Sequence, residues 1–231
     1  MLKNIQDQNK SYINNNFINI LSKVFLSYSF VIILMLVFCY LTKEVLEFET
    51  LSFDKNIIDL IAQLRSPQLT PIMIQVSYIG ETGAIILITI LSLYVIINKQ
   101  YYTFLNILFS TSSALLFTYF FKKIIMRSRP DPLYRLILES NYSYPSGHAT
   151  VTFTIFPIIA IYFILLTKLK YSIKLLISII TISIPILVSF SRLYLGVHYF
   201  TDILAGALVG LTFGLVFYIV TKKIININLL K

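Results

Sequence analysis

The sequence predicts an all-α polytopic membrane protein, with six transmembrane helices in one bundle and a short amphipathic surface helix after the first span. Of its 231 residues, 57% are hydrophobic and only 13% are charged, which is too apolar for an ordinary soluble domain. The apolar residues also come in runs long enough to cross a bilayer as helices. The length fits one compact membrane domain with no large soluble one.

Six apolar runs are expected to cross the membrane. They cover residues 24–41, 71–97, 102–121, 149–166, 175–190 and 199–220. The expected domain organisation is a polar tail at 1–23, one membrane domain at 24–223 and a second tail at 224–231. The first tail has no short apolar core followed by a small-residue cleavage site, so a cleaved signal peptide is not expected.

Two features stand out around the second span. Before it, Phe53, Ile57, Ile61 and Leu64 recur every three or four residues, which is typical of an amphipathic helix on a membrane surface. Within it, Glu81 lies at membrane depth, where an acidic residue is a functional candidate. The alternative is that Glu81 pairs with an arginine or hydroxyl near the outer surface, and its role stays open.

The distribution of basic residues indicates which way the chain is oriented in the membrane. Six spans put both ends of the chain on one side of the membrane. With that side cytoplasmic, ten lysines lie inside and nine Lys and Arg lie outside, most of them clustered in two connections. This near balance favours cytoplasmic termini only if the outer basic residues are held in a site. We therefore expect a multi-pass plasma-membrane protein with both termini cytoplasmic and its site on the extracytoplasmic face.

Composition also bears on partners. The net charge is +9, and the basic residues lie mostly at the ends of the spans, which favours membrane lipids over nucleic acid as partners.

Cys39 is the only cysteine and cannot form an internal disulfide. Gly206, Gly210 and Gly214 form a doubled GxxxG in the sixth span, a seam that lets helices approach closely. Packing within the chain is favoured over a homodimer, and the oligomeric state stays open.

Three polar stretches carry the candidate functional residues and meet on the outer face in the expected topology. They read KKIIMRSRP at 122–130, PSGH at 145–148 and SRLYLGVHYFTD at 191–202. They contain three cations, Lys122, Arg129 and Arg192, which together are costly at a membrane edge without an anion. Arg presents a fork matched to phosphate oxygens, and Lys adds a point charge.

The same stretches supply the groups for phosphoryl transfer. Ser146 offers a hydroxyl, and Gly147 offers an amide near a helix start, where anions are favoured. Asp202 follows His198 by four residues, so on a helix it can hold the imidazole ring in one tautomer. With His148 on the other side of the bound group, one histidine can attack phosphorus and the other can protonate the leaving oxygen. No metal or other cofactor is expected, because the cations neutralise the charge.

The pattern KxxxxxxRP, PSGH and SRxxxxxHxxxD resembles the type 2 phosphatidic acid phosphatase superfamily, over roughly residues 50–220. The resemblance implies that His198 is the nucleophile and forms a phosphohistidine, that Asp202 orients it, and that His148 is the general acid. It also implies which residues bind the phosphoryl oxygens: Lys122, Arg129, Arg192, Ser146 and Gly147. The implied substrates in the bacterial branch are undecaprenyl pyrophosphate, phosphatidylglycerol phosphate and phosphatidic acid.

Other interpretations remain. A lipid transporter or scramblase could bind phosphate headgroups without hydrolysis, and an inactive relative could serve as a scaffold. The apolar spans argue against the soluble vanadium haloperoxidases that share the motif. Arg127, Asp131 and Arg135 lie near the motifs, where they could tune the site or be solvated, and they receive no role. The sequence does not identify the lipid or decide between a monophosphate and a diphosphate.

Overall fold

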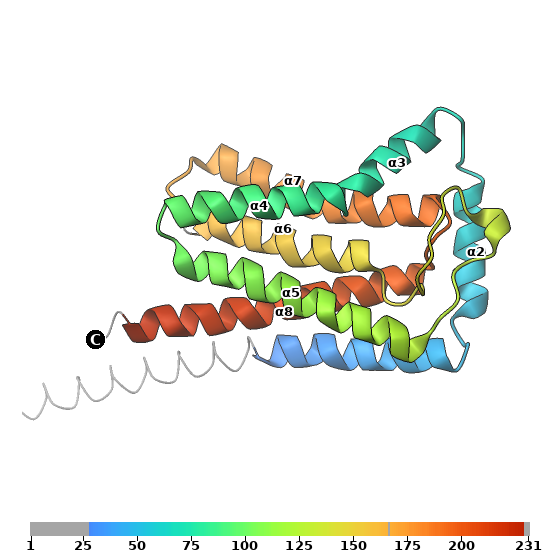
Figure 1. Ribbon diagram of the computed structural model, residues 1–231, viewed down its shortest axis with the longest axis horizontal. Coiled ribbons are helices and arrows are strands. Elements are labelled where there is room, and N and C mark those ends of the chain that lie inside the picture. Colours follow the sequence, from blue (N-terminus) through green and yellow to red (C-terminus); the bar gives the residue numbers. More distant parts are fainter. Residues whose placement is uncertain (1–27, 166, 229–231) are drawn as a thin grey trace, which may run out of the picture.

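The computed structural model describes residues 28–165 and 167–228, and the secondary structure of this part of the chain is helical. Six of its segments are long and apolar enough to cross a membrane, as predicted. The expected tail at 1–23 lies outside the described residues. The spanning segments are the first helix (Tyr28–Leu46), α3 (Leu69–Ile79) with α4 (Thr82–Ile97), α5 (Tyr101–Ile125), α6 (Gly147–Leu165), α7 (Tyr171–Tyr194) and α8 (Phe200–Asn228) (Figure 1).

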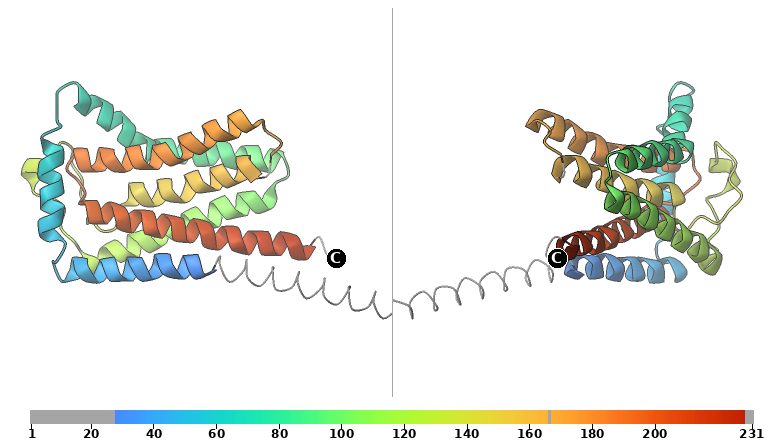
Figure 2. Two further views of the ribbon diagram at one scale, coloured as in Figure 1. Left: turned by 180° about the vertical axis from the view of Figure 1, so that it is seen from behind. Right: turned by 60° about the vertical axis from the view of Figure 1, so that its left-hand side comes forward.

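Helix α6 lies at the centre of the bundle and packs against α8, α7 and α5 (Figure 2). Its contact with α8 depends on the predicted glycine seam. A Cβ on Gly206 would lie 2.4 Å from the carbonyl oxygen of Ser146, and one on Gly210 would lie 2.5 Å from that of Thr150. Both distances are too short for any side chain, so these glycines let two backbones of the same chain touch.

The second span is interrupted, whereas one uninterrupted run over 71–97 was expected. Helix α3 ends at Ile79 and is capped by Gly80. Glu81 has φ −122° and ψ −97°, and α4 starts at the next residue, at an angle to α3 (Figure 1). The break packs onto other spans, because a Cβ on Gly80 would lie 2.6 Å from the Val188 side chain and 3.0 Å from the His148 ring. It therefore brings Glu81 beside α6.

Helix α2 (Leu51–Ala62) is the predicted amphipathic helix, and it lies across one end of the bundle (Figure 1). Some of the residues that define the predicted apolar spacing lie on its exposed side. Phe53 and Leu64 are more than half exposed, whereas Asp54, Ile58 and Ile61 are buried. The buried face includes a carboxylate because α2 covers polar groups of the bundle end.

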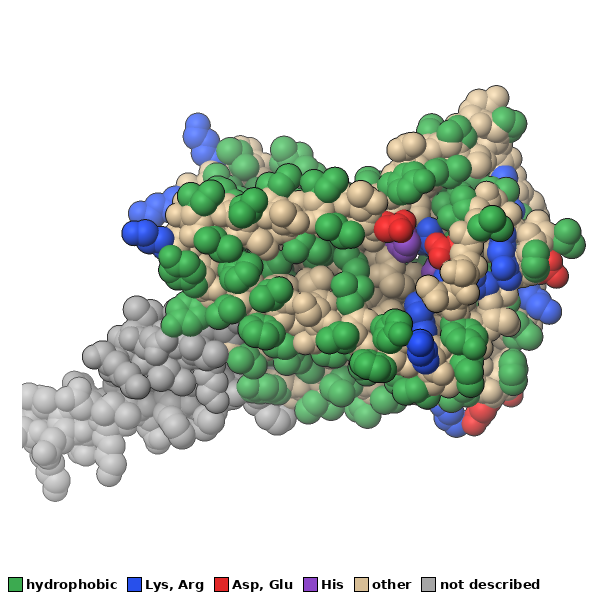
Figure 3. Space-filling view, viewed as in Figure 1, with side chains coloured by type: hydrophobic (Ala, Val, Ile, Leu, Met, Phe, Trp, Pro, Cys, Tyr) green, Lys and Arg blue, Asp and Glu red, His purple; other side chains and the backbone are tan. Residues whose placement is uncertain are grey.

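The polar connections that carry the motifs lie at this same end, together with the short 3₁₀ helix η1 (Pro132–Tyr134). Figure 3 shows histidine, acidic and basic side chains gathered there, while hydrophobic side chains cover the flanks of the bundle. Helix α8 ends at the opposite end, and the first helix runs towards the α2 end (Figure 1). The candidate functional residues therefore lie together at the end of the bundle that α2 covers.

Candidate active site

His198 lies in the short connection between α7 and α8 and is buried. Its Nδ1 is 3.3 Å from Oδ2 of Asp202, which lies in the first turn of α8. The same carboxylate oxygen accepts a hydrogen bond of 2.9 Å from the backbone N–H of Tyr199. The predicted spacing of four residues thus brings ring and carboxylate together, and the backbone contact fixes the carboxylate.

The other ring nitrogen of His198 faces a cation. Nη1 of Arg129 lies 3.3 Å from Nε2, and a guanidinium can only donate, so Nε2 carries the lone pair and Nδ1 the proton. Burial, and next the charges of Arg129, Lys122 and Arg192, hold the pKa of His198 well below its usual range. The imidazole is therefore neutral at neutral pH, with Nε2 available as a nucleophile.

The three motif cations come from three different elements. Lys122, near the end of α5, donates to the carbonyl oxygens of Tyr142 at 2.5 Å and Ser143 at 3.1 Å. Arg129 lies in the following connection and donates to the Val197 carbonyl oxygen at 2.7 Å. Arg192 lies in the last turn of α7 and is almost fully buried; its Nη1 donates to the Ser77 hydroxyl at 2.7 Å. Backbone and hydroxyl oxygens aim these side chains without neutralising their charge.

Glu139 provides a carboxylate that the sequence analysis missed. It pairs with Nη2 of Arg129 at 3.3 Å and with Nη2 of Arg192. One carboxylate thus bridges the two arginines expected to bind phosphate. Glu139 lies in the irregular connection before the PSGH stretch, where no spacing or periodicity singles it out.

Three motif residues each have a buried polar atom that lacks a hydrogen-bond partner among the described residues. These atoms are Oγ of Ser146, Nε2 of His148 and Nε of Arg192. Leaving a buried polar atom unpaired costs about 1–3 kcal/mol, so such atoms gathered at one end of the bundle indicate a ligand site. Gly147 adjoins them, and a Cβ built on it meets no atom within 4 Å. Open space therefore lies next to the first amide groups of α6.

Arg127, which received no role from the sequence, is a largely buried bridge. Its guanidinium pairs with Asp202 at 2.5 Å and with Asp54 of α2 at 2.7 Å. It also lies 4.3 Å from the centre of the Tyr199 ring. Asp54, fully buried, further accepts hydrogen bonds from the Thr201 hydroxyl at 2.6 Å and the Thr201 N–H at 3.1 Å. Helix α2 is thereby tied to the carboxylate beside His198.

Within the described part of the chain, Glu81 makes no ion pair with an arginine and no hydrogen bond to a hydroxyl, the two partners considered for it. The nearest charged partner of its carboxylate is Nε2 of His148, 3.8 Å away. The His148 side chain is 14% exposed and that of Glu81 is 61% exposed. The intramembrane acid therefore lies at the rim of the site, on the His148 side.

Comparisons with known proteins agree with this geometry. Residues 103–226 match the PAP2 superfamily. Phosphatidylglycerophosphatase B of Bacillus subtilis (strain 168) is 31% identical over 170 residues, which cover 73% of this chain and 82% of that protein. Undecaprenyl-diphosphatase of Sulfolobus acidocaldarius is 37% identical over 94 residues, which cover 38% of this chain and 41% of that protein.

Two solved structures are similar as well. The crystal structure of a transmembrane PAP2-type phosphatidylglycerolphosphate phosphatase from Bacillus subtilis has a TM-score of 0.78 and 29% identity, covering 84% of this chain and 96% of that one. That of Aquifex aeolicus LpxE has a TM-score of 0.52 and 25% identity, covering 71% and 93%. The motifs, the six spans and these relatives agree: the chain belongs to the PAP2 superfamily and is a membrane lipid phosphatase.

Proposed function

We propose that this protein hydrolyses the terminal phosphate of a lipid phosphate through a phosphohistidine formed on Nε2 of His198. The observation that carries the proposal is the unpaired state of Ser146 Oγ, His148 Nε2 and Arg192 Nε, which are buried in the part of the chain that the structure describes. A phosphoryl group would accept hydrogen bonds from the serine and the arginine and would bring a leaving oxygen to the histidine.

In the first step the lone pair on Nε2 of His198 attacks phosphorus, and the bond from phosphorus to the leaving oxygen breaks. His148, in its protonated imidazolium form, transfers the Nε2 proton to that oxygen and is left as a neutral imidazole. Asp202 accepts the Nδ1–H hydrogen bond and stabilises the positive charge that the ring gains. In the second step His148 takes a proton from water as the water attacks phosphorus, and the P–N bond breaks to restore His198.

The charge that develops on the phosphoryl oxygens is met by Lys122, Arg129 and Arg192, together with Ser146 and the amide of Gly147. These donors are held by their own hydrogen bonds before the substrate arrives, so little reorganisation is needed in the transition state. Glu139 occupies the two arginines in the free enzyme and has to give way to the incoming phosphate.

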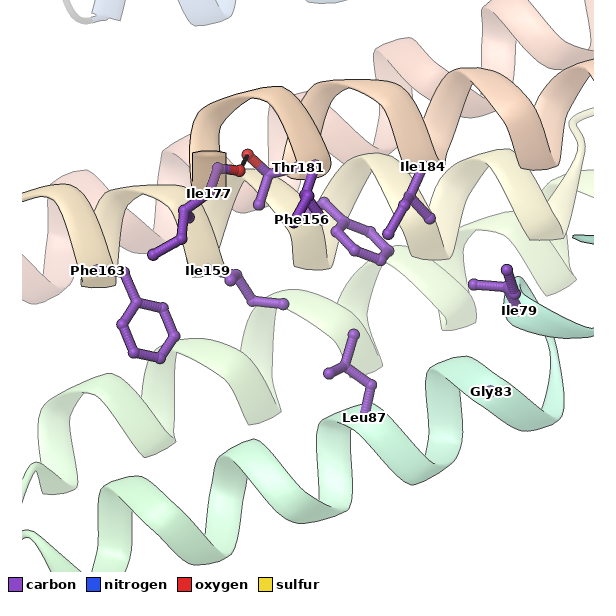
Figure 4. A pocket seen from close by; sticks show the side chains of 10 residues that line it. Ile79, Gly83, Leu87, Phe156, Ile159, Phe163, Ile177, Thr181 and Ile184 are labelled. Carbon is purple, nitrogen blue, oxygen red and sulfur yellow. Dashed lines mark hydrogen bonds between the residues drawn. The ribbon is translucent and has the colours of Figure 1, made fainter. Parts of the chain in front are cut away.

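An apolar groove suits the lipid tail. It has a volume of about 490 Å³ and lies between α4, α6 and α7, with Ile79 and Gly83 at one end and Phe163 and Ile177 at the other (Figure 4). Ile79 and Gly83 flank the break that packs on His148, so the groove starts beside the site. At 1.5 Å per residue, the stretch of α6 from Phe156 to Phe163 makes it about 10 Å long.

The orientation and the substrate complete the proposal. The site lies at the end of the bundle opposite to the end of α8, so a cytoplasmic end of α8 would put it on the extracytoplasmic face of the plasma membrane (Figure 1). The relatives named phosphatidylglycerophosphatase B and undecaprenyl-diphosphatase make phosphatidylglycerol phosphate and undecaprenyl pyrophosphate the first candidates, with phosphatidic acid as the third.

The test is a phosphate-release assay with purified protein in detergent on these three lipids, with His198→Ala beside the wild type. We expect release from at least one lipid and its loss in the variant. We also expect a ³²P label on the wild-type protein that is labile in acid and stable in alkali, as a phosphoramidate is. No release from any lipid phosphate, or release that survives His198→Ala, would contradict the proposal.

A further inference from the structure

Glu81 is a charged group at the site that the proposed mechanism does not use. Its position is set by the break in the second span, where Gly80 packs directly on the ring of His148. Its carboxylate oxygen lies 3.8 Å from Nε2 of His148, the atom that is to protonate the leaving oxygen. The carboxylate therefore lies on the leaving-group side of the site.

The apolar groove is a second, independent indication that Glu81 lies on the leaving-group side of the site. Ile79 and Gly83, which stand on either side of Glu81 in the chain, both line the end of the apolar groove nearest to the site. A tail in this groove is attached to the substrate through its leaving group, because hydrolysis separates the lipid from the phosphate. The leaving group thus passes Glu81 on its way from His148 to the groove.

The charges around His148 differ between its two sides. On the phosphate side, the positive charges that interact with the His148 ring are those of Lys122, Arg129 and Arg192. The ring of His198, the proposed nucleophile, interacts with it from the same side. Glu139 lies among these cations and is paired with two of them. Towards the leaving group, the ion pair among the described residues that reaches His148 is the one with Glu81, whose side chain is 61% exposed and makes no ion pair with an arginine in this part of the chain.

We propose that Glu81 is a specificity-determining residue that favours lipid monophosphates over lipid diphosphates. The inference rests on the proposed role of His148 as the acid that protonates the leaving oxygen. It addresses the choice between the two substrate classes, which the proposed phosphate-binding residues leave open because they would meet the same transferred phosphoryl group in both.

The hydrolysis of a monophosphate and that of a diphosphate differ in the charge of the leaving group that passes Glu81. With a monophosphate, the bond between phosphorus and the alkoxy oxygen breaks, the oxygen takes the proton of His148, and a neutral alcohol leaves. With a diphosphate, His198 attacks the terminal phosphorus, the bond to the bridging oxygen breaks, and that oxygen takes the proton. The leaving lipid monophosphate still carries negative charge, and a carboxylate a few ångströms away repels it.

The experiment compares dodecyl phosphate and dodecyl diphosphate, which share one tail, with the full-length protein in detergent. The quantity measured is the ratio of kcat/KM for the diphosphate to kcat/KM for the monophosphate. We expect Glu81→Gln to raise this ratio by about tenfold to a hundredfold. Glu81→Asp should keep it near the wild-type value, and added salt should shrink the difference, because the carboxylate is largely exposed.

Glu49→Gln is the matched control, since it removes a negative charge from an exposed residue in the turn before α2. An unchanged ratio in Glu81→Gln, or an equal rise in Glu49→Gln, would overturn the inference. The proposed function is judged separately: wild-type hydrolysis of either compound that disappears in His198→Ala supports it whatever the ratio does. Hydrolysis of neither compound by the wild type would overturn both.

Discussion

Replacing Asp54 by alanine tests the link between α2 and the site. The change removes three interactions: the ion pair with Arg127 and the hydrogen bonds from the Thr201 hydroxyl and N–H. Breaking a buried ion pair costs about 3–5 kcal/mol, because the remaining charge stays buried without its partner. Asp202 still pairs with Arg127, which lowers the cost, whereas the loss of the acceptor for the Thr201 hydroxyl and N–H raises it, so we expect a loss of about 4 kcal/mol.

For a chain of this size, each kcal/mol lowers Tm by about 2–4 °C, so Asp54→Ala should unfold about 8–16 °C below wild type in detergent. Asp59→Ala is the control on the same helix. Its exposed carboxylate accepts one hydrogen bond among the residues that the structure describes, from the Tyr134 hydroxyl at the surface, so the Tm of Asp59→Ala should stay near wild type. Equal Tm values for the two alanine variants would refute the buried bridge.

A double-mutant cycle with Arg127→Gln separates the pair from other effects of each change. A coupling free energy on the order of 2 kcal/mol is expected between Asp54 and Arg127, since the two side chains share a hydrogen bond in a buried network. Phosphate release should fall as well, because Arg127 also holds the Asp202 carboxylate that accepts from His198. Additive effects on Tm would show that the two side chains act independently.

Three further predictions follow from other contacts. Glu139→Gln should tighten inhibition by orthovanadate about tenfold, because a charged carboxylate no longer competes for the two arginines, and weaker inhibition would count against that competition. Gly210→Leu should lower Tm strongly, whereas Gly214→Ala, whose Cβ would have its nearest neighbour at 3.4 Å, should not; equal Tm values would contradict the seam. Ile180→Trp should fill the groove and slow hydrolysis of long-chain lipid phosphates more than of short-chain ones, and an equal effect on both would separate the groove from the substrate.

The motif residues could be found from sequence because their signal is local. His198 and Asp202 are four residues apart, and the helix geometry of that spacing brings them together in the structure. The six spans could be found for a similar reason, since hydropathy is a property of a continuous segment. Both signals are contained in short windows of sequence.

The residues that were missed depend on contacts between distant segments. Asp54 reads as a polar position on a surface helix until Arg127 and Thr201 are brought against it. Glu139 lies in an irregular connection, where no periodicity marks which side chain turns inward. The break at Gly80 reads as part of an apolar run, because its cause is packing against α6 and α7. Such features follow from tertiary structure, which a single sequence specifies only indirectly.

The buried position of Asp54 has a consequence for how the catalytic unit is delimited. The segment that matches the superfamily begins at residue 103, yet the site draws on Asp54, Ser77 and Glu81, all of which precede it. A truncated protein that kept every motif residue would therefore lack the carboxylate partner of Arg127 and the hydroxyl that aims Arg192. Transplanting the N-terminal third between homologues is accordingly expected to alter selectivity while the two motif histidines stay the same.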